Sequence, residues 1–282
     1  MVFEDLVRPK FAKKHPLWLF FLGLLFSILA VIFGLFLFPN ESSLVIVFLV
    51  VIMSMPFMYF TLKREEEEGL IIDSEVRLLK EHSLALGFLL YLFLGFVVGF
   101  SLFYIFLPQE TVTQVFSSQL DTIQSINSNS VSTGFFLNHF SIIFANNLKV
   151  LFFTLLFAIF FGAGAIFILA WNASVISAAV GTYVRNALAE SISVLGFTKL
   201  SLYFTLFVTG MLRYMVHGVF EIAAYFIAGL AGGIISMAII NNKVRLVKLK
   251  KVVKDACILV GIAIILLLLG AFVEVFITPL FF

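Results

Sequence analysis

Long apolar runs separated by short polar segments form the main pattern of this 282-residue chain. Five runs are each long enough for one membrane crossing, because a helix needs about 20 apolar residues to cross the hydrocarbon. They are Leu17–Phe38, Leu44–Leu62, Ser83–Leu107, Val150–Trp171 and Ala256–Val273. Leu200–Ile240 is about twice that length, so we predict a helical hairpin there, with two crossings or two re-entrant arms. The pattern predicts an all-α, polytopic transmembrane bundle of about seven spans.

The composition agrees with a chain whose solvent is mainly lipid. Hydrophobic residues make up 62% of it and charged residues 12%, and the mean hydropathy is +1.15. Soluble domains are about half apolar and a quarter charged, so this chain cannot cover a water-facing surface. Its one cysteine, Cys257, excludes an internal disulfide and a thiolate metal cluster. We expect the lipid bilayer as a partner, and no nucleic acid, metal or cofactor.

The lysines and arginines predict the orientation of the spans. Three basic clusters lie before the first span, between the second and third spans, and after Ile240. The segments without lysine or arginine are Pro39–Ser43, Pro108–Asn138 and Ile277–Phe282. Cytoplasmic loops are enriched in basic residues, which predicts a multi-pass protein of the cell membrane with a cytoplasmic N-terminus. Lys149, at the outer end of the fourth run, departs from this pattern, and we expect its amine to extend to the headgroups.

Three further segments are predicted to be helices that do not cross the membrane. Asn138–Leu148 has apolar residues at helical spacing, which is typical of a short helix in the outer headgroups. Lys63–His82, with the acidic run Glu65–Glu68, is typical of a solvated amphipathic helix in the cytoplasm. Ala173–Gly196 is interrupted by charge, so we expect it to lie on the cytoplasmic face or to dip into it as a re-entrant segment.

Charged residues within an apolar stretch are candidates for function, because placing them at membrane depth costs a few kcal/mol each. Arg213, His217 and Glu221 are spaced i, i+4, i+8 and share one face of a continuous helix. They would form an intramembrane polar cluster. It could be an ionic clamp between helices, part of a conducting or binding path, or a catalytic group.

Other polar and small residues suggest where helices meet. Asn146, Asn147 and Asn172 would support the cluster or cap helices and bond between them. Gly95 and Gly99, like Gly229 and Gly233, have the G-x-x-x-G spacing that lets helix backbones approach closely. Gly162 has the same predicted packing role in the fourth run.

Three segments together resemble a known family. Asn146-Asn147-Leu148-Lys149 opens a Phe-rich run, His217-Gly218-Val219-Phe220-Glu221 follows, and then comes Phe226-Ile227-Ala228-Gly229-Leu230-Ala231-Gly232. This resembles the stage II sporulation protein M family of integral membrane proteins, in which an H-G-x-x-E helix precedes a stretch of small residues. The resemblance implies a family domain at 83–282, preceded at 1–82 by a two-span extension with the acidic cytoplasmic helix.

Three hypotheses for function follow, in the order in which we rank them. The first is a non-enzymatic scaffold or subunit of a membrane complex, in contact with other membrane proteins or further copies of itself; the family resemblance and the glycine faces favour it. The second is a channel or transporter with a polar path lined by Arg213, His217 and Glu221. The third is an intramembrane hydrolase that uses His217 and Glu221, although the sequence offers no accompanying nucleophile.

The absence of lysine and arginine predicts that Pro108–Asn138 lies on the outer side. Cysteines introduced at Ser118 and Ser128 should react with an impermeant thiol reagent in intact cells. Labelling that appears only after lysis would reverse the predicted orientation.

Overall fold

A computed structural model describes residues 16–71, 75–131, 136–161, 165–190, 197–240 and 246–281. Within these ranges the chain is helical and contains no strand. The helices are α3 (Pro16–Leu37), α4 (Ser42–Ile71), α5 (Glu75–Phe106), α6 (Gln109–Val115), α7 (Ser117–Val131), α8 (Phe136–Phe161), α9 (Ala165–Glu190), α10 (Phe197–Ile240) and α11 (Leu246–Phe272). Short turns of 3-10 helix cover Pro39–Glu41 (η1) and Thr278–Leu280 (η3), and a π-helical turn covers Val273–Ile277 (η2).

Seven of the described helices are long and apolar enough to cross a membrane, which confirms the predicted all-α bundle of about seven spans. The candidate spans are Leu17–Leu37, Pro39–Glu65, Ala85–Phe106, His139–Phe160, Ala165–Glu190, Thr198–Ile240 and Leu249–Leu280. The cytoplasmic location of the N-terminus stays a prediction.

The predicted number of spans is right although two segments were assigned wrongly: one span too many was predicted in Leu200–Ile240, and one was missed in Ala173–Gly196. Leu200–Ile240 is not a hairpin, because α10 continues through it as one helix of 44 residues. The segment predicted to lie on the cytoplasmic face, Ala173–Gly196, instead forms most of α9 up to Glu190, and 191–196 lie outside the described residues. Its small side chains are buried against neighbouring helices, and its charged residues lie near its end.

The fourth predicted span was also displaced. Val150–Trp171 is divided between α8 and α9, because the apolar run continues unbroken past the end of α8 at Phe161. The predicted interfacial helix Asn138–Leu148 is the first part of α8, and Lys149 lies well inside that span with an exposed side chain. Lys63–His82 is not a separate helix, since α4 continues to Ile71 and α5 begins at Glu75.

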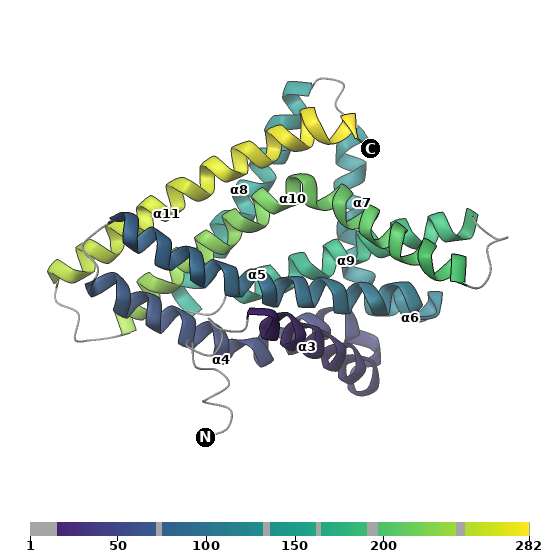
Figure 1. The fold of residues 1–282 in the computed structure, drawn as a ribbon, viewed down its shortest axis with the longest axis horizontal. Helices are drawn as coiled ribbons and strands as arrows, with labels where there is room; N and C mark the ends of the chain where they lie inside the picture. Colours follow the sequence, from purple (N-terminus) through teal and green to yellow (C-terminus); the bar gives the residue numbers. More distant parts are fainter. Residues whose placement is uncertain are drawn as a thin grey trace.

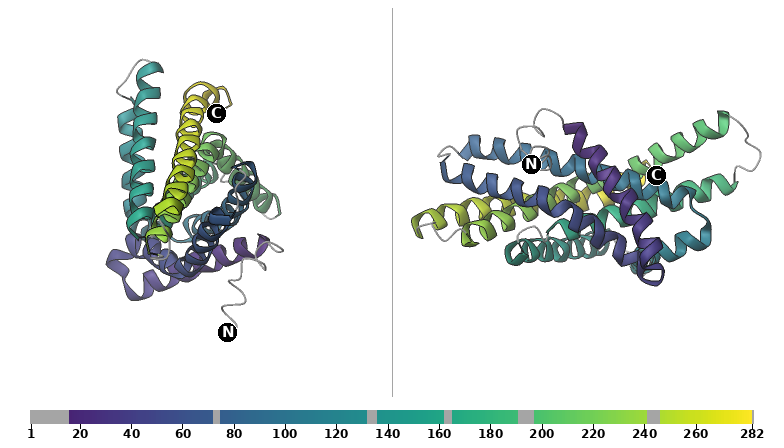
Figure 2. Two further views of the ribbon diagram at one scale, coloured as in Figure 1. Left: turned by 90° about the vertical axis from the view of Figure 1, so that its left-hand side faces the viewer. Right: turned by 90° about the horizontal axis from the view of Figure 1, so that it is seen from below.

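The long helices form one bundle in which α5 and α10 contact most of the others (Figure 1). α5 packs along α3 and α9, and α10 packs along α8, α9 and α11. Figure 1 shows that α10 bends near the middle of its length. α3 and α4 pack together on one side of the bundle (Figure 2), and α4 also reaches α11. A helix of 44 residues is roughly 66 Å long, about twice the hydrocarbon thickness, so α10 cannot cross it straight and upright.

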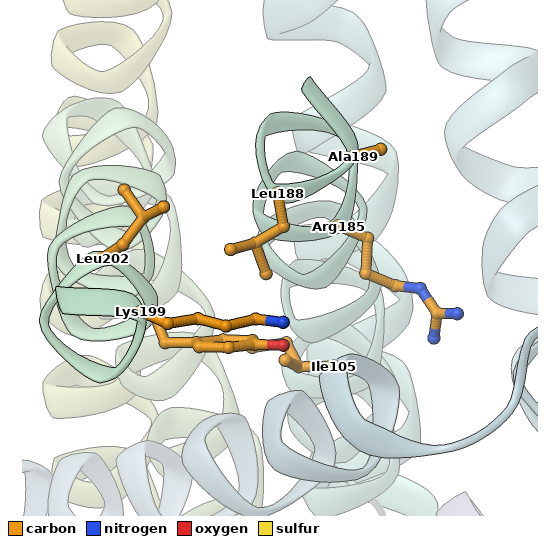
Figure 3. Close-up of a pocket in the computed structure, with 7 residues that line it drawn as sticks. Ile105, Arg185, Leu188, Ala189, Lys199 and Leu202 are labelled. Atoms are coloured by element: carbon orange, nitrogen blue, oxygen red, sulfur yellow. The ribbon is translucent and has the colours of Figure 1, made fainter. Parts of the chain in front are cut away.

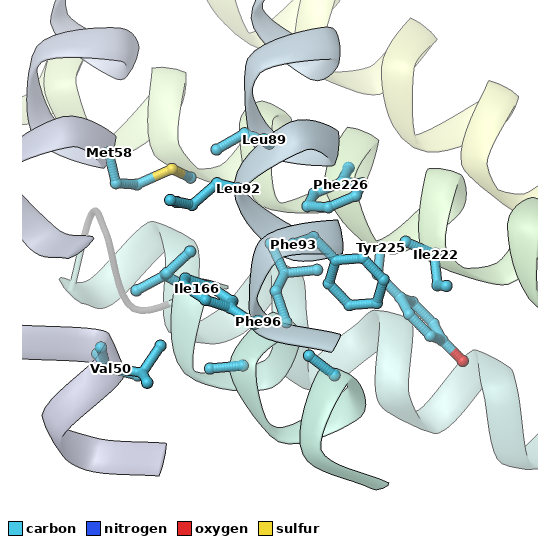
Figure 4. Close-up of a cluster of buried hydrophobic side chains, with 14 of the residues drawn as sticks. Val50, Met58, Leu89, Leu92, Phe93, Phe96, Ile166, Ile222, Tyr225 and Phe226 are labelled. Atoms are coloured by element: carbon cyan, nitrogen blue, oxygen red, sulfur yellow. The ribbon is translucent and has the colours of Figure 1, made fainter. Parts of the chain in front are cut away.

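Aromatic and aliphatic side chains from four helices fill the centre (Figure 4). Phe93 of α5 meets Phe226 of α10 edge to face, with ring centroids 5.7 Å apart. Met58 of α4 and Ile166 of α9 are buried in the same core. This core joins the two N-terminal spans to the rest of the bundle.

Glycine permits the closest helix contact, between α3 and α5. A Cβ at Gly95 would overlap the carbonyl oxygen of Phe20, and one at Gly99 would overlap the Ser27 hydroxyl. On α10, a Cβ at Gly229 would lie 2.8 Å from the Cβ of Ala165, and one at Gly233 would overlap Leu62. These glycines face helices of the same chain. Gly162 lies outside the described residues.

We expect Gly95→Ala to lower the free energy of unfolding by about 1–3 kcal/mol, because the added methyl meets backbone that cannot move aside. Gly87→Ala, on the same helix, is the matched control, since nothing lies within 4 Å of its added Cβ. That control should be neutral or stabilising by up to about 1 kcal/mol. Thermal unfolding in detergent measures both; equal melting temperatures for the two variants would contradict the close contact.

Candidate functional site

Two acidic side chains meet where α8, α10 and the end of α11 come together. Glu221 of α10 accepts a hydrogen bond at Oε1 from Nδ2 of Asn147 on α8. Glu221 is also hydrogen-bonded to Glu274, in the π-helical turn that follows α11. Ionised carboxylates only accept hydrogen bonds, so two carboxyl groups that bond to each other must hold a proton between them. We call Asn147, Glu221 and Glu274 the carboxyl-pair site.

Local backbone features bring the two carboxyl groups together. The π-helical turn Val273–Ile277 adds a residue per turn relative to an α-helix, which changes the direction in which Glu274 projects. Gly270, one turn earlier, provides the space: a Cβ there would lie 3.2 Å from Cγ of Glu221. The helical turn at 278–280 then begins with Thr278 and Pro279.

His217 lies one turn before Glu221 on α10 and contacts the same end of the chain. Its Nδ1 is 3.3 Å from Oγ1 of Thr278. Thr278 donates its hydroxyl proton to the carbonyl oxygen of Val273, at 3.2 Å. With its proton directed at Val273, the threonine oxygen is placed to accept from the tautomer of His217 that carries a proton on Nδ1. His139 of α8 interacts electrostatically with Glu274 and completes the polar surroundings.

The residues proposed from sequence are only partly brought together. Asn147, His217 and Glu221 surround the end of α11, whereas Arg213 is exposed and its guanidinium lies 5.9 Å from the ring centroid of Tyr183 on α9. Asn146 is exposed on α8. Asn172 donates to the carbonyl oxygen of Ile168, one turn earlier in its own helix, at 2.7 Å.

Glu274 and Thr278 were missed at the sequence level. The signal was present, because Glu274 is an acidic residue at the end of a long apolar run. The apolar run was counted as a span and its last residues were treated as an outer tail. Contact with α10 depends on the π-helical turn, which no pattern of apolar residues indicates.

A second polar cluster, also missed, lies where α4, α5 and α11 meet. His82 of α5 is 1% exposed, with Nδ1 2.7 Å from Oε2 of Glu65 and Nε2 3.0 Å from Oδ2 of Asp255. Glu65 and Asp255 are buried as well, so the prediction that Glu65 lies on a solvated helix was wrong. We call these three residues the histidine clamp.

Both ring nitrogens of His82 face a carboxylate, which favours the imidazolium form. Burial lowers the pKa of His82, but hydrogen bonds and charge attraction from Asp255 and Glu65 outweigh burial and raise its pKa to about 9. The histidine is therefore charged at neutral pH and links three helices at once.

The two clusters lie at opposite ends of α11. Asp255 is near its start and Glu274 just follows its end, 19 residues later, which is roughly 28 Å along a helix. That separation is close to the thickness of the hydrocarbon, about 30 Å. The clamp and the carboxyl-pair site are therefore separated along α11 by about one hydrocarbon thickness.

Comparison with protein families gives one match. The model of the family named stage II sporulation protein M matches residues 88–279. The chain belongs to the stage II sporulation protein M family. No curated protein and no solved structure matches it.

Within this family member, the matched region contains the whole carboxyl-pair site, together with His217 and Thr278. The histidine clamp crosses the boundary of the match, because Glu65 and His82 precede it and Asp255 lies inside it. The residues before the match are therefore joined to the family region by a buried ionic contact as well as by the core.

The histidine clamp predicts a loss of stability at high pH. The pKa of His82 is about 9 when folded and about 6.5 in a free side chain, so its stabilising effect is full below about pH 6.5 and is lost as pH rises through about 9. We expect His82→Leu to remove this component of the pH dependence. The melting temperature in detergent between about pH 6 and about pH 10 measures it.

The same variant should be less stable at neutral pH, by about 3–5 kcal/mol, because two buried carboxylates lose their counter-charge. Glu65→Gln should also destabilise, whereas Glu67→Gln, two residues away and exposed, should not. A wild-type pH profile in His82→Leu, or equal effects of the two glutamine variants, would exclude the clamp.

Proposed function

We propose that this family member is a transporter or channel in the cell membrane that binds a proton at the carboxyl-pair site and exchanges it for a small cation. The observation that carries the proposal is the hydrogen bond between Glu221 and Glu274 within two membrane-spanning segments. Ionisable side chains at such positions typically line ion pathways or proton relays.

The chemistry of the pair suits exchange. Two carboxylates side by side in a low-dielectric environment repel each other strongly, so one shared proton greatly reduces the electrostatic cost. In the described part of the chain, neither carboxyl group pairs with a lysine or arginine. An incoming cation would balance the charge left when the proton leaves, beside whatever His139 contributes through its interaction with Glu274.

The surrounding donors suit a hard cation. After proton loss the site offers carboxylate oxygens from Glu221 and Glu274, and the hydroxyl of Thr278 lies nearby; Asn147 directs its amide nitrogen at Glu221 and would offer its oxygen only after the amide turns over. Carboxylate, amide and hydroxyl oxygens are the ligands that small alkali and alkaline-earth cations prefer. Glu221 keeps part of its surface uncovered, and a path for a proton or ion to the pair would open on that side.

The scaffold role is the second candidate, and in it the same residues have a structural role. In that case the carboxyl-pair site joins α8, α10 and α11 through hydrogen bonds, which stabilise contacts between helices in a membrane. The glycine faces add little support to it, because Gly95, Gly99, Gly229 and Gly233 face helices of this chain. The family membership is its remaining support.

Glu221→Gln separates the two roles. The amide of glutamine can still donate to Glu274, so the contact is kept while the exchangeable proton is lost. We expect liposomes loaded with sodium or calcium ions and containing the wild-type protein to take up protons as the cation leaves down its gradient, as followed by a pH-sensitive dye inside. Glu221→Gln and Glu274→Gln should reduce the rate to that of empty liposomes.

Glu110→Gln, exposed on α6, is the matched control and should transport like the wild type. A melting temperature close to wild type shows that each variant is folded. Wild-type liposomes no faster than empty ones under proton, sodium and calcium gradients would overturn the transport proposal. Undiminished flux in folded Glu221→Gln would show that the pair only ties helices together.

A further inference from the structure

A cleft opens where three helix ends meet, away from both polar clusters (Figure 3). It lies between the end of α5, the end of α9 and the start of α10, and its volume is about 410 Å³. Arg185, Lys199 and Tyr203 supply its polar atoms, and aliphatic side chains line the remainder. None of the described residues that line the cleft is acidic, so its two cations are not neutralised by its own walls.

Arg185 is held in place by backbone contacts. Its Nη1 donates to the carbonyl oxygens of Tyr104 and Leu107, both at 2.9 Å, at the end of α5. A guanidinium has five N–H groups, so three remain after these two bonds. The contact fixes a positive charge at the cleft and leaves donors that can bind an anion.

Lys199 and Tyr203 approach from α10. Both line the cleft, and Figure 3 shows the Lys199 side chain extending toward Ile105 while the Arg185 guanidinium points away from it. All three side chains line the cleft, and an ammonium, a guanidinium and a phenol can each donate a hydrogen bond to a phosphate group.

The cleft lies at the boundary of the membrane. The candidate spans of α5 and α9 end at Phe106 and Glu190, and that of α10 begins at Thr198, next to the cleft residues. Phe106 is 62% exposed, and its ring centroid lies 5.4 Å from that of Tyr203. An apolar surface therefore continues directly from the polar cleft.

That apolar surface extends along α10. Exposed large side chains recur every four residues on it, at Leu200, Phe204, Val208 and Leu212. Such a stripe on a membrane helix faces acyl chains. A molecule with a phosphate group at one end and hydrocarbon chains at the other could occupy the cleft and the stripe at the same time.

We propose that this cleft binds the phosphate group of an acidic membrane phospholipid, with its acyl chains against the α10 stripe. Arg185 and Lys199 balance the phosphate charge, and Tyr203 donates a hydrogen bond. Free phosphate would gain the polar contacts alone, so the apolar stripe assigns the ligand to the lipid. The inference concerns a different end of the bundle and does not rest on the proposed transport function.

The test uses the full chain in a non-ionic detergent, with bound lipid measured by native mass spectrometry. Phosphatidylglycerol should bind more tightly than phosphatidylcholine, because its headgroup has no cation to offset the phosphate. Lys199→Gln should weaken phosphatidylglycerol binding about tenfold, the effect of losing one charged hydrogen bond. Arg185 is left unchanged because it also holds the end of α5.

Lys250→Gln, exposed on α11 at the other end of the bundle, is the matched control and should bind like the wild type. If Lys199→Gln does not fold, Tyr203→Phe replaces it and should weaken binding by a smaller factor. Unchanged binding in the cleft variant, or an equal loss in Lys250→Gln, overturns the site. Inorganic phosphate binding as tightly as phosphatidylglycerol overturns the lipid as its ligand.

Discussion

Hydrocarbon offers no hydrogen bonds, and this constraint governs most of the structure. A charged side chain buried among the spans is costly unless it finds a partner inside the protein. The histidine clamp meets this requirement with charge: His82 stands between Glu65 and Asp255, and both of its ring nitrogens are used. The carboxyl-pair site meets it with a shared proton, because Glu221 and Glu274 are both acids and bond to each other.

The same constraint explains why close helix packing depends on glycine. Helices in lipid gain little from hiding apolar side chains from one another, so contact depends on fit. At Gly95 the backbone of α3 approaches so closely that even a methyl group would overlap a carbonyl oxygen. At Gly270 the missing side chain leaves space for Glu221, which shows that a small residue can serve a polar contact as well as an apolar one. A G-x-x-x-G pattern identifies a glycine at a helix–helix contact, such as Gly95, but not one that makes room for a polar side chain, such as Gly270.

Hydropathy predicted how many spans there are but not where each one ends. The apolar run through Val150–Trp171 continues past the end of α8, so composition could not reveal the break. The length of Leu200–Ile240 suited two crossings, yet Gly218 at its middle does not end the helix, which continues through Arg213–Glu221. Part of the carboxyl-pair site could be predicted from the sequence, because Glu221 is a charged residue within a long apolar stretch. Its partner Glu274 was not, because their contact needs three helices and a π-helical turn to come together. Glu65 was misread for a related reason: a run of four glutamates indicates water, and only tertiary contact reveals that one of them is buried.

α11 connects the two polar clusters. Because the clusters differ in chemistry, the two ends of α11 differ in how readily they can move. At its start, Asp255 is held by the charged His82, which also binds Glu65 on α4. Beyond its end, Glu274 is held through a proton that it shares with Glu221, in a π-helical turn followed by a short 3-10 turn. Loss of that proton would convert an attraction into repulsion between two carboxylates, while the clamp at the start would be unaffected. Under the proposed exchange, movement is therefore confined to the last turns of the chain, next to His217 and the bend in α10. A cation that entered between the separated carboxylates would attract both of them. The end of α11 would then close again, with the cation in place of the proton.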